Sequence, residues 1–307
     1  MSKRILITGG CGFVGSHVAR KLATQKHDIM VVDNLSTGRI ENINWHFRPY
    51  PRFRNNNILD LQRMNDAFHD FRPDAVIHLA AQPSLQESWK NAPFDAQTNI
   101  IGTINLLGLC QRYKVKKFVF ASTSAVYAPN AIGWYSEDDL IGPQNPYGVS
   151  KAAAEYYIRI SGIPYTILRL GNVYGPRQVP LGENQLIPRA LAHIYQGEPF
   201  EVYGDGKQIR SFVYVEDVAK AFVKAVEGNA RGTFNIAGGV GLAVNVVLKK
   251  LWRLIPYTMY WHHGPPKPGE LHCVCLDVGK ADYSPLGWKA ETSLRSGLAK
   301  TVKAWPK

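Results

Sequence analysis

The sequence predicts an α/β protein built on a doubly wound parallel sheet, because short apolar segments alternate with helical patterns along its first half. Val14, Val18 and Leu22 recur every four residues, as on the buried face of a helix. Further helical patterns cover about 94–113 and 147–160. Fully apolar strands that alternate with helices are typical of a parallel sheet covered on both faces. The expected strands are 5–7, 29–32, 75–79, 118–121 and 166–170.

The second half of the chain has a different composition, which predicts a smaller, loop-rich lobe. After about residue 175, Pro and Gly recur in clusters such as Gly204-Asp205-Gly206 and Gly264-Pro265-Pro266. Two later apolar segments still have the pattern of buried strands, so part of this half is expected to return to the first sheet. These segments are 212–215 and 234–236. We expect a first domain of residues 1–172, rejoined by about 211–237, and a second lobe of residues 173–307.

Length and composition are those of an ordinary globular protein. The 307 residues are 45% hydrophobic and 20% charged, which excludes disordered and collagen-like chains. No apolar segment is long enough to span a bilayer, and 1–7 lacks the features of a signal peptide. With only four cysteines, a cytoplasmic location is expected. Neither Cys273-x-Cys275, which has no second pair, nor the adjacent His262 and His263 predicts a metal site.

The chain is strongly basic, with 36 Lys and Arg against 24 Asp and Glu and a net charge of +12. Nucleic acid, an anionic surface or anionic small substrates could each explain this excess. The cations are scattered, and the densest group, 112–117, lies between a helix and a strand, where a solvated turn is expected. A nucleic-acid-binding module is therefore the least favoured class, and no nucleic acid or membrane partner is expected.

A glycine-rich turn follows the first strand and opens the first helix. Glycines at Gly9, Gly12 and Gly15 allow a tight turn, close approach of the backbone to a pyrophosphate, and packing of the helix on the sheet. Asp33 ends the second strand, where a carboxylate can bond both ribose hydroxyls and would repel a 2′-phosphate. The sequence therefore predicts a Rossmann dinucleotide site that takes NAD in preference to NADP.

Six motifs, in order along the chain, resemble the extended short-chain dehydrogenase/reductase family, and within it the nucleotide-sugar epimerases of the UDP-glucose 4-epimerase type. The resemblance runs from residue 3 to about 300. The motifs are Gly9-x-x-Gly12-x-x-Gly15, Asp33-Asn34-Leu35-Ser36, His78-Leu79-Ala80-Ala81, Ser122-Thr123-Ser124-Ala125-Val126-Tyr127, Tyr147-x-x-x-Lys151 and Tyr203-Gly204-Asp205-Gly206.

The resemblance implies a catalytic triad of Thr123, Tyr147 and Lys151. Tyr147 and Lys151 are four residues apart and share one helix face. A tyrosine has an ordinary pKa near 10, and a nearby ammonium, together with the positive nicotinamide ring, would lower it into the working range of a base. The adjacent hydroxyl of Ser124 is the nearest rival of Thr123, and is otherwise expected to face the sugar.

Other roles follow from the same resemblance. The residues expected to bind NAD are Gly9, Gly12, Phe13, Val14, Gly15, Asp33, Asn34, Ser36, Asn57, Ile58, Leu79, Ala80, Ala81, Asn99, Tyr147 and Lys151. Those expected to bind the substrate are Ser124, Asn172, Arg210, Lys267, Glu270 and Val274. The chain departs from the family at Asn57, where an Asp is usual, and at Lys267 and Glu270, which replace an Arg and an Asp. Val274 is small, where a large residue would restrict the sugar pocket.

The expected activity is that of an NAD-dependent nucleotide-sugar 4-epimerase that acts on UDP-glucose and UDP-galactose, and the small Val274 extends this expectation to their N-acetyl forms. It would oxidise C4, rotate the 4-keto sugar and reduce it again, and it is expected to be a homodimer. Relatives that dehydrate or decarboxylate the sugar carry an acid where this chain has Ala125. Those two activities, a 4-reductase or dehydrogenase, and a non-catalytic NAD-binding regulatory protein are the alternatives.

Overall fold

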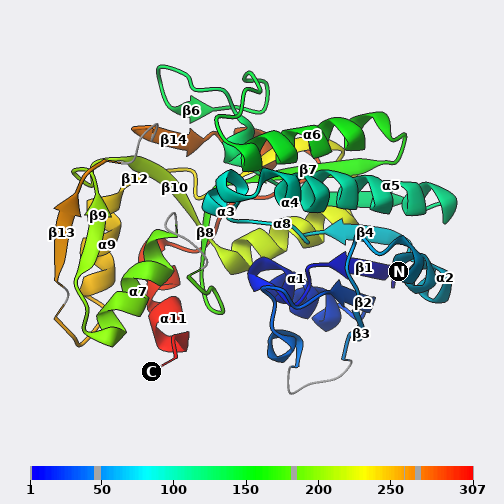
Figure 1. Cartoon of the computed structure of the whole chain (residues 1–307), viewed down its shortest axis with the longest axis horizontal. Coiled ribbons are helices and arrows are strands. Elements are labelled where there is room, and N and C mark those ends of the chain that lie inside the picture. Colours follow the sequence, from blue (N-terminus) through cyan, green and yellow to red (C-terminus); the bar gives the residue numbers. More distant parts are fainter. Residues whose placement is uncertain (1, 45–49, 181–184, 259, 267–270, 307) are drawn as a thin grey trace.

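Seven parallel strands form the central sheet of the computed structural model, in the order β11-β7-β5-β4-β1-β2-β3 (Figure 1). The structure describes residues 2–44, 50–180, 185–258, 260–266 and 271–306. The expected strands are all present, and the polar edge strand β3 adds a seventh member. The sheet strands are β1 (Arg4–Thr8), β2 (Asp28–Asp33), β3 (Arg52–Asn55), β4 (Ala75–His78), β5 (Lys117–Thr123), β7 (Tyr165–Leu170) and β11 (Gly232–Ile236).

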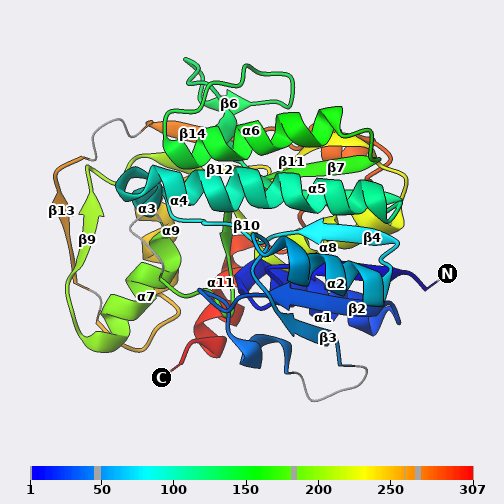
Figure 2. The same cartoon turned by 45° about the vertical axis from the view of Figure 1, so that its right-hand side comes forward.

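Helices cover both faces of this sheet, as a doubly wound fold requires (Figure 2). Alternate residues of β1 separate the two cores: Ile5 packs with α1 and α8, whereas Leu6 packs with α2, α5 and α6. The sequence prediction of the fold class is confirmed. The helices are α1 (Phe13–Thr24), α2 (Leu61–Phe71), α5 (Gly102–Arg112), α6 (Pro146–Ile160) and α8 (Val215–Glu227).

The helix expected at about 94–113 is divided into three parts. A short helix, α4 (Ala92–Ala96), leads into a π-helical turn, η2 (Gln97–Ile101), before α5 begins at Gly102. Such turns widen a helix locally and are frequent at functional sites. Here the turn carries Asn99, whose side chain is buried. A second short helix, α3 (Leu85–Lys90), precedes α4.

Only one of the two later apolar segments returns to the central sheet. β11 pairs with β7 in parallel register, from Gly232 beside Thr166 to Ile236 beside Leu170. The other segment forms β10 (Ile209–Tyr214), which instead pairs with β8 (Asn172–Tyr174). β8 continues β7 beyond the central sheet after a single residue, Gly171. Its partner β10 therefore lies outside the central sheet.

The second layer of structure is built around β10 (Figure 1). β10 lies between β12 and β14, and β6 extends this sheet, while β13 and β9 form a separate pair. Helices α7, α9 and α11 pack together in an apolar core of their own. The remaining elements are η1 (Ile40–Ile43), η3 (Ser124–Val126), β6 (Trp134–Tyr135), α7 (Leu186–Gln196), β9 (Phe200–Tyr203), β12 (Gly241–Ala243), α9 (Val244–Trp252), β13 (Trp261–Gly264), β14 (Cys273–Leu276), α10 (Gly279–Tyr283) and α11 (Leu294–Ala304).

Candidate functional site

The glycine turn between β1 and α1 leaves no space for side chains. Gly9 has φ +71°, and a Cβ there would lie 2.5 Å from the backbone nitrogen of Ala80. A Cβ on Gly15 would lie 2.1 Å from the carbonyl oxygen of Gly9. Gly12 precedes α1, and no described side chain caps the helix there. The first-turn amides are therefore available to an anion, so the turn fits a dinucleotide pyrophosphate.

Asp33 is fixed next to this turn. Its carboxylate accepts hydrogen bonds from the backbone N–H of Cys11 (2.9 Å) and of Leu35 (2.8 Å). Burial raises the pKa of Asp33, and these two bonds act in the opposite direction. Beside it, the side-chain oxygen of Asn34 accepts from both the N–H and the hydroxyl of Ser36. A carboxylate held in this place at the end of β2 is positioned as the ribose-binding role requires.

A buried polar chain supports the opposite wall of the cofactor cleft. His78, which ends β4, contacts the hydroxyls of Thr8 (2.7 Å) and Thr103 (3.0 Å) through its two ring nitrogens. Burial holds the pKa of His78 well below its usual value, so the ring is neutral. The Thr8 hydroxyl also accepts a hydrogen bond from the backbone of Ala80. This fixes 79–81 opposite the glycine turn.

Three other residues expected near the cofactor make local contacts. Asn57 is exposed, and its side-chain oxygen accepts the N–H of Leu59. Ile58 is buried, and its side chain fills the space beside Gly102. Asn99 uses its amide group within the protein, donating to Gln82, Asp95 and Ser150. The amide group of Asn99 therefore links η2 to α4 and α6.

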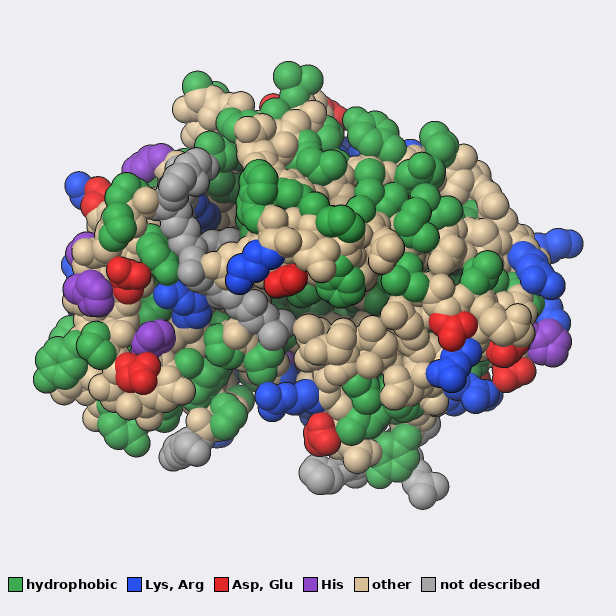
Figure 3. All heavy atoms as spheres, in the orientation of Figure 1, with side chains coloured by type: hydrophobic (Ala, Val, Ile, Leu, Met, Phe, Trp, Pro, Cys, Tyr) green, Lys and Arg blue, Asp and Glu red, His purple; other side chains and the backbone are tan. Residues whose placement is uncertain are grey.

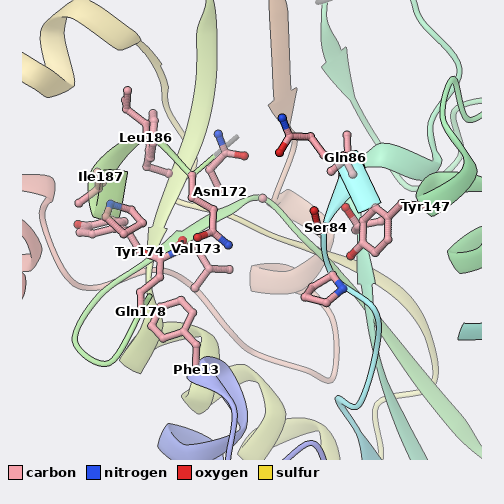
Figure 4. Close-up of a pocket in the computed structure, with 17 residues that line it drawn as sticks. Phe13, Ser84, Gln86, Tyr147, Asn172, Val173, Tyr174, Gln178, Leu186 and Ile187 are labelled. Carbon is pink, nitrogen blue, oxygen red and sulfur yellow. Dashed lines mark hydrogen bonds between the residues drawn. The ribbon is translucent and has the colours of Figure 1, made fainter. Parts of the chain in front are cut away.

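Helix α6 presents the Tyr-x-x-x-Lys pair. Asn145 caps the helix through Gly148, and Pro146 opens it. Tyr147 lines a cavity of about 260 Å³ together with Thr123 (Figure 4). Burial raises the pKa of Tyr147 to about 12, although a hydrogen bond with Thr123 opposes this. In the protein alone, burial therefore outweighs any lowering of the Tyr147 pKa by the lysine.

Lys151 lies one turn further along α6 and is 3% exposed. Its ammonium nitrogen lies 4.0 Å from the centre of the Phe120 ring, a cation–π contact. Burial lowers the pKa of Lys151 to about 7, while the carboxylates of Glu155 and Asp95 oppose this. The charge of this lysine at neutral pH therefore depends on the buried carboxylates around it.

The three adjacent hydroxyls at the end of β5 have different surroundings. Ser122 donates to the buried carboxylate of Glu155 (2.5 Å), beneath the helix. Thr123 lines the cavity and also accepts the N–H of Ala125 (3.1 Å). Ser124 begins the short helix η3 and is half-buried. Of the three hydroxyl residues, Thr123 is thus the one that lines the cavity together with Tyr147.

The far side of the cavity comes from the second half of the chain, and sequence reasoning missed most of it. Figure 4 shows Tyr147 and Ser84 on one side, with Tyr174, Gln178 and Leu186 on the other. None of the sequence motifs includes Tyr174, Gln178 or Leu186. These residues face Tyr147 only because β8 pairs with β10. The cavity-lining residues missed from the sequence are Pro83, Ser84, Leu85, Gln86, Gly171, Val173, Tyr174, Gln178, Gln185, Leu186, Ile187, Pro188 and Phe212.

Of the predicted substrate residues that the structure describes, Asn172 lines this cavity, whereas Ser124, Arg210 and Val274 do not. Arg210 lies on β10, where its guanidinium donates to the carbonyls of Ile209 (2.8 Å) and His272 (3.3 Å). Val274 on β14 pairs with Arg210 and packs against the apolar cluster that includes Tyr127. It is not among the residues that line the cavity. The predicted residues Lys267 and Glu270 lie outside the described residues.

Comparison with known proteins identifies the family. Residues 5–237 match the model of the NAD dependent epimerase/dehydratase family. The chain belongs to this family. The resemblance to the extended short-chain dehydrogenase/reductases is thereby confirmed, and with it the prediction of an enzyme with NAD as cofactor.

Solved structures of similar proteins agree over nearly the whole chain. The UDP-glucose 4-epimerase of Thermotoga maritima, solved with UDP-glucose, is 39% identical with a TM-score of 0.92, covering 98% of each chain. The enzyme of the same name from Thermus thermophilus, in complex with NAD, is 34% identical with a TM-score of 0.87, again over 98% of each chain. A UDP-N-acetylglucosamine 4-epimerase from Methanobrevibacter ruminantium is 30% identical with a TM-score of 0.91, covering 99% of this chain and 98% of its own.

Two further observations concern what the described part of the chain contains. None of its helices has the length and apolar composition that a bilayer span requires. Its His, Cys, Asp and Glu side chains form no group of three or more that could hold a metal ion. His262 and His263 have separate contacts: His262 lies 3.8 Å from Glu201, and His263 contacts the carbonyl of Gly204.

The surroundings of Asp33 predict a strong preference for NAD. The purified protein should bind NAD at least about tenfold more tightly than NADP, because the fixed carboxylate would face the added phosphate. Asp33→Asn should narrow this ratio, since it removes the charge and keeps an acceptor. Calorimetric titration with both cofactors measures the ratio. Equal affinities in the wild type would contradict this role of Asp33, and Arg39 is the nearby cation to test for a softened preference.

Proposed function

We propose that this chain is a 4-epimerase of UDP-hexoses. The observation that carries the proposal is that Thr123 and Tyr147 line one cavity beside the glycine turn, with Lys151 on the next turn of the same helix. UDP-glucose 4-epimerases of known structure, including one solved with its UDP-sugar, support the choice of substrate. We assign the catalytic, cofactor and substrate roles to the residues that the sequence resemblance indicates.

In this proposal Tyr147 is the base. It takes the proton of the sugar 4-hydroxyl, and Thr123 holds both groups in line. Bound NAD would supply the redox chemistry at C4, and the glycine turn and Asp33 would hold it. Because burial raises the pKa of Tyr147 to about 12, the phenolate needs positive charge nearby in the working complex. The ammonium of Lys151 supplies part of it.

Rotation of the sugar between the two steps requires that the diphosphate is bound more strongly than the sugar. Arg210 and Asn172 are proposed to hold the diphosphate, for which a guanidinium is well suited. The cavity next to Tyr147 is lined by apolar side chains such as Phe13, Leu186 and Phe212 and by polar ones such as Ser84 and Gln178. A strongly held diphosphate beside such a surface lets the 4-keto sugar turn about its link to the nucleotide. Binding of the diphosphate by cations such as Arg210 accounts for part of the net positive charge of the chain.

Dehydration and decarboxylation are less well supported. Either reaction needs a further acid or base beyond Tyr147, since the sugar must lose water, or lose CO2 and take up a proton at the carbon left behind. Ala125, in the short helix after Thr123, contributes to the nearby contacts only a backbone N–H, which bonds Thr123. The intact pair of Thr123 and Tyr147 also argues against a non-catalytic binding protein.

Incubation with UDP-, GDP- and dTDP-sugars, followed by NMR analysis of the products, tests the proposed function. UDP-glucose should be converted to UDP-galactose by the wild type. Tyr147→Phe should lose about 10²-fold to 10⁴-fold in kcat while retaining NAD, because the proton acceptor is gone. Tyr156→Phe, an exposed position on the same helix, is the matched control. No epimerised product from the wild type, or more than about a tenth of the activity in Tyr147→Phe, would contradict the proposal.

We also propose that the pocket accepts 2-N-acetylated sugars, because Val274 is small. The likeness to a UDP-N-acetylglucosamine 4-epimerase supports this, whereas the packing of Val274 against the Tyr127 cluster is the competing explanation of its size. Val274→Tyr should lower kcat/KM for UDP-N-acetylglucosamine at least about tenfold relative to UDP-glucose, by filling the space. Val274→Leu is the milder control. The role of Val274 as a wall of the sugar pocket would be excluded if the wild type were inactive on acetylated sugars. An unchanged ratio of the two kcat/KM values in Val274→Tyr would exclude it as well.

The apolar outer face of α4, α5 and α6 supports a homodimer. Phe94, Ile101 and Val149 are exposed there, as are Tyr156 and Ile160. Figure 3 shows hydrophobic side chains gathered over α5 and α6. A groove between α3, α4 and the start of α6 runs past Trp89. Patches of this kind usually mark an interface, and paired helices from two copies would cover this one.

Light scattering at micromolar concentration should give a mass about twice the 34.3 kDa of one chain. Ile160→Glu combined with Tyr156→Glu should shift the protein toward monomer, because two charges would be buried at the interface. Trp252→Glu, an exposed apolar position on α9, is the control. A monomeric wild type would contradict the homodimer. The cytoplasmic location, which the four free cysteines support, stays a proposal, as do the domain limits.

A further inference from the structure

The ammonium of Lys151 is almost fully enclosed, and its charge needs a partner. Burial of an unpaired ammonium is costly, so such groups are normally balanced by a carboxylate or lose their proton. Four titratable groups from three elements face it. Tyr147 and Glu155 come from α6, His78 from β4 and Asp95 from α4.

Two of these four carry no charge in the protein alone. Burial raises the pKa of Tyr147 to about 12 and holds the pKa of His78 well below its usual value. Both are therefore neutral at physiological pH. The partner of Lys151 must be Glu155 or Asp95.

The charge of Glu155 is already balanced. Its carboxylate is 2% exposed and binds the guanidinium of Arg169 through both oxygens, at 3.0 and 2.7 Å. Arg159 adds a further contact at 2.9 Å, and Ser122 donates at 2.5 Å. One carboxylate with two guanidinium groups leaves this cluster with a net positive charge. Glu155 raises the pKa of Lys151 more than Asp95 does, but two guanidinium groups share its charge, so much of its attraction for the ammonium is offset.

Asp95 differs from Glu155 in the partners of its carboxylate. It is 1% exposed, and its Oδ1 accepts hydrogen bonds only from neutral amides, those of Gln82 (2.9 Å) and Asn99 (3.1 Å). No salt bridge between described residues involves it. The same amide nitrogen of Asn99 also donates to the hydroxyl of Ser150 (3.0 Å), the residue before Lys151. A buried, uncompensated carboxylate is thus linked to the turn that carries the buried ammonium.

We propose that Asp95 is the counter-charge of Lys151, and so a positioning residue that keeps the ammonium protonated beside Tyr147. This inference rests on the proposed 4-epimerase activity only for the roles of Tyr147 and Lys151. Asp95 touches neither group directly. It acts through the electrostatic potential of its charge, which hydrogen bonds from Gln82 and Asn99 hold in place.

Asp95→Asn tests the charge with little change in shape, because the amide oxygen still accepts from Gln82 and Asn99. Loss of one negative charge lowers the pKa of every nearby group. The acid limb of the kcat profile, set by Tyr147, and the alkaline limb, set by Lys151, should therefore both move to lower pH, by about one unit. A purely structural role would lower kcat without moving either limb.

Two variants separate charge from packing. Asp95→Glu keeps the charge and should leave both limbs in place, whatever its kcat. Ser150→Ala breaks the link to Asn99 without a change in charge, and its limbs should stay within about 0.3 pH units of the wild type. The proposal would be overturned if the two limbs of the kcat profile did not move in Asp95→Asn. It would also be overturned if they moved equally far in Ser150→Ala.

A measurement that needs no substrate keeps this test independent of the proposed activity. In protein labelled with ¹⁵N-lysine, the Lys151 signal, assigned by its absence from Lys151→Met, should show a protonated amine at pH 6. It should titrate about one unit lower in Asp95→Asn. If the wild type epimerises no sugar, this shift still supports the counter-charge. A wild-type amine that is neutral at pH 6 would overturn it, even if Asp95→Asn does not fold.

Discussion

The buried ion pair of Glu155 and Arg169 fixes the position of helix α6 on the sheet, and the catalytic geometry depends on it. Through one carboxylate, α6 is tied to Arg169 on β7 and to Ser122 on β5. Tyr147 lies two turns before this anchor, and Thr123 lies one residue after Ser122. Replacement of such a pair by apolar residues can be neutral, but loss of one partner costs about 3–5 kcal/mol. The pair therefore specifies where α6 lies more than it adds stability.

The two ends of the site depend on different kinds of constraint. At the cofactor end, the backbone itself forms the binding surface, since a Cβ on Gly9 or Gly15 would collide with the neighbouring main chain. That constraint is local, and the sequence displays it as a spacing of glycines. At the sugar end, the surface is made of side chains from β5, α6, β8 and α7, which meet only after the second sheet has formed.

This difference explains what could be predicted from the sequence. The apolar strands, the glycine turn, Asp33 and the pair Tyr147 and Lys151 each have a pattern within a short window. β3 was missed because its sequence is polar, as is usual for an exposed edge strand. The contact partners of Tyr174 and Gln178 follow from pairing between distant strands. Glu155 did carry a signal, since a charge four residues after Lys151 lies on the same buried helix face.

The distribution of charge around α6 is consistent with a site that becomes active only when its cofactor is present. In the protein alone, His78 is neutral and Asp95 balances the charge of Lys151, so these groups leave little positive field to stabilise a phenolate. A bound dinucleotide with a positive nicotinamide ring would supply further positive charge to stabilise the phenolate of Tyr147. Desolvation, which otherwise works against the base, then strengthens this attraction, because the same low dielectric acts on both. Burial of the catalytic pair is thus a cost in the free protein and an advantage in the complex.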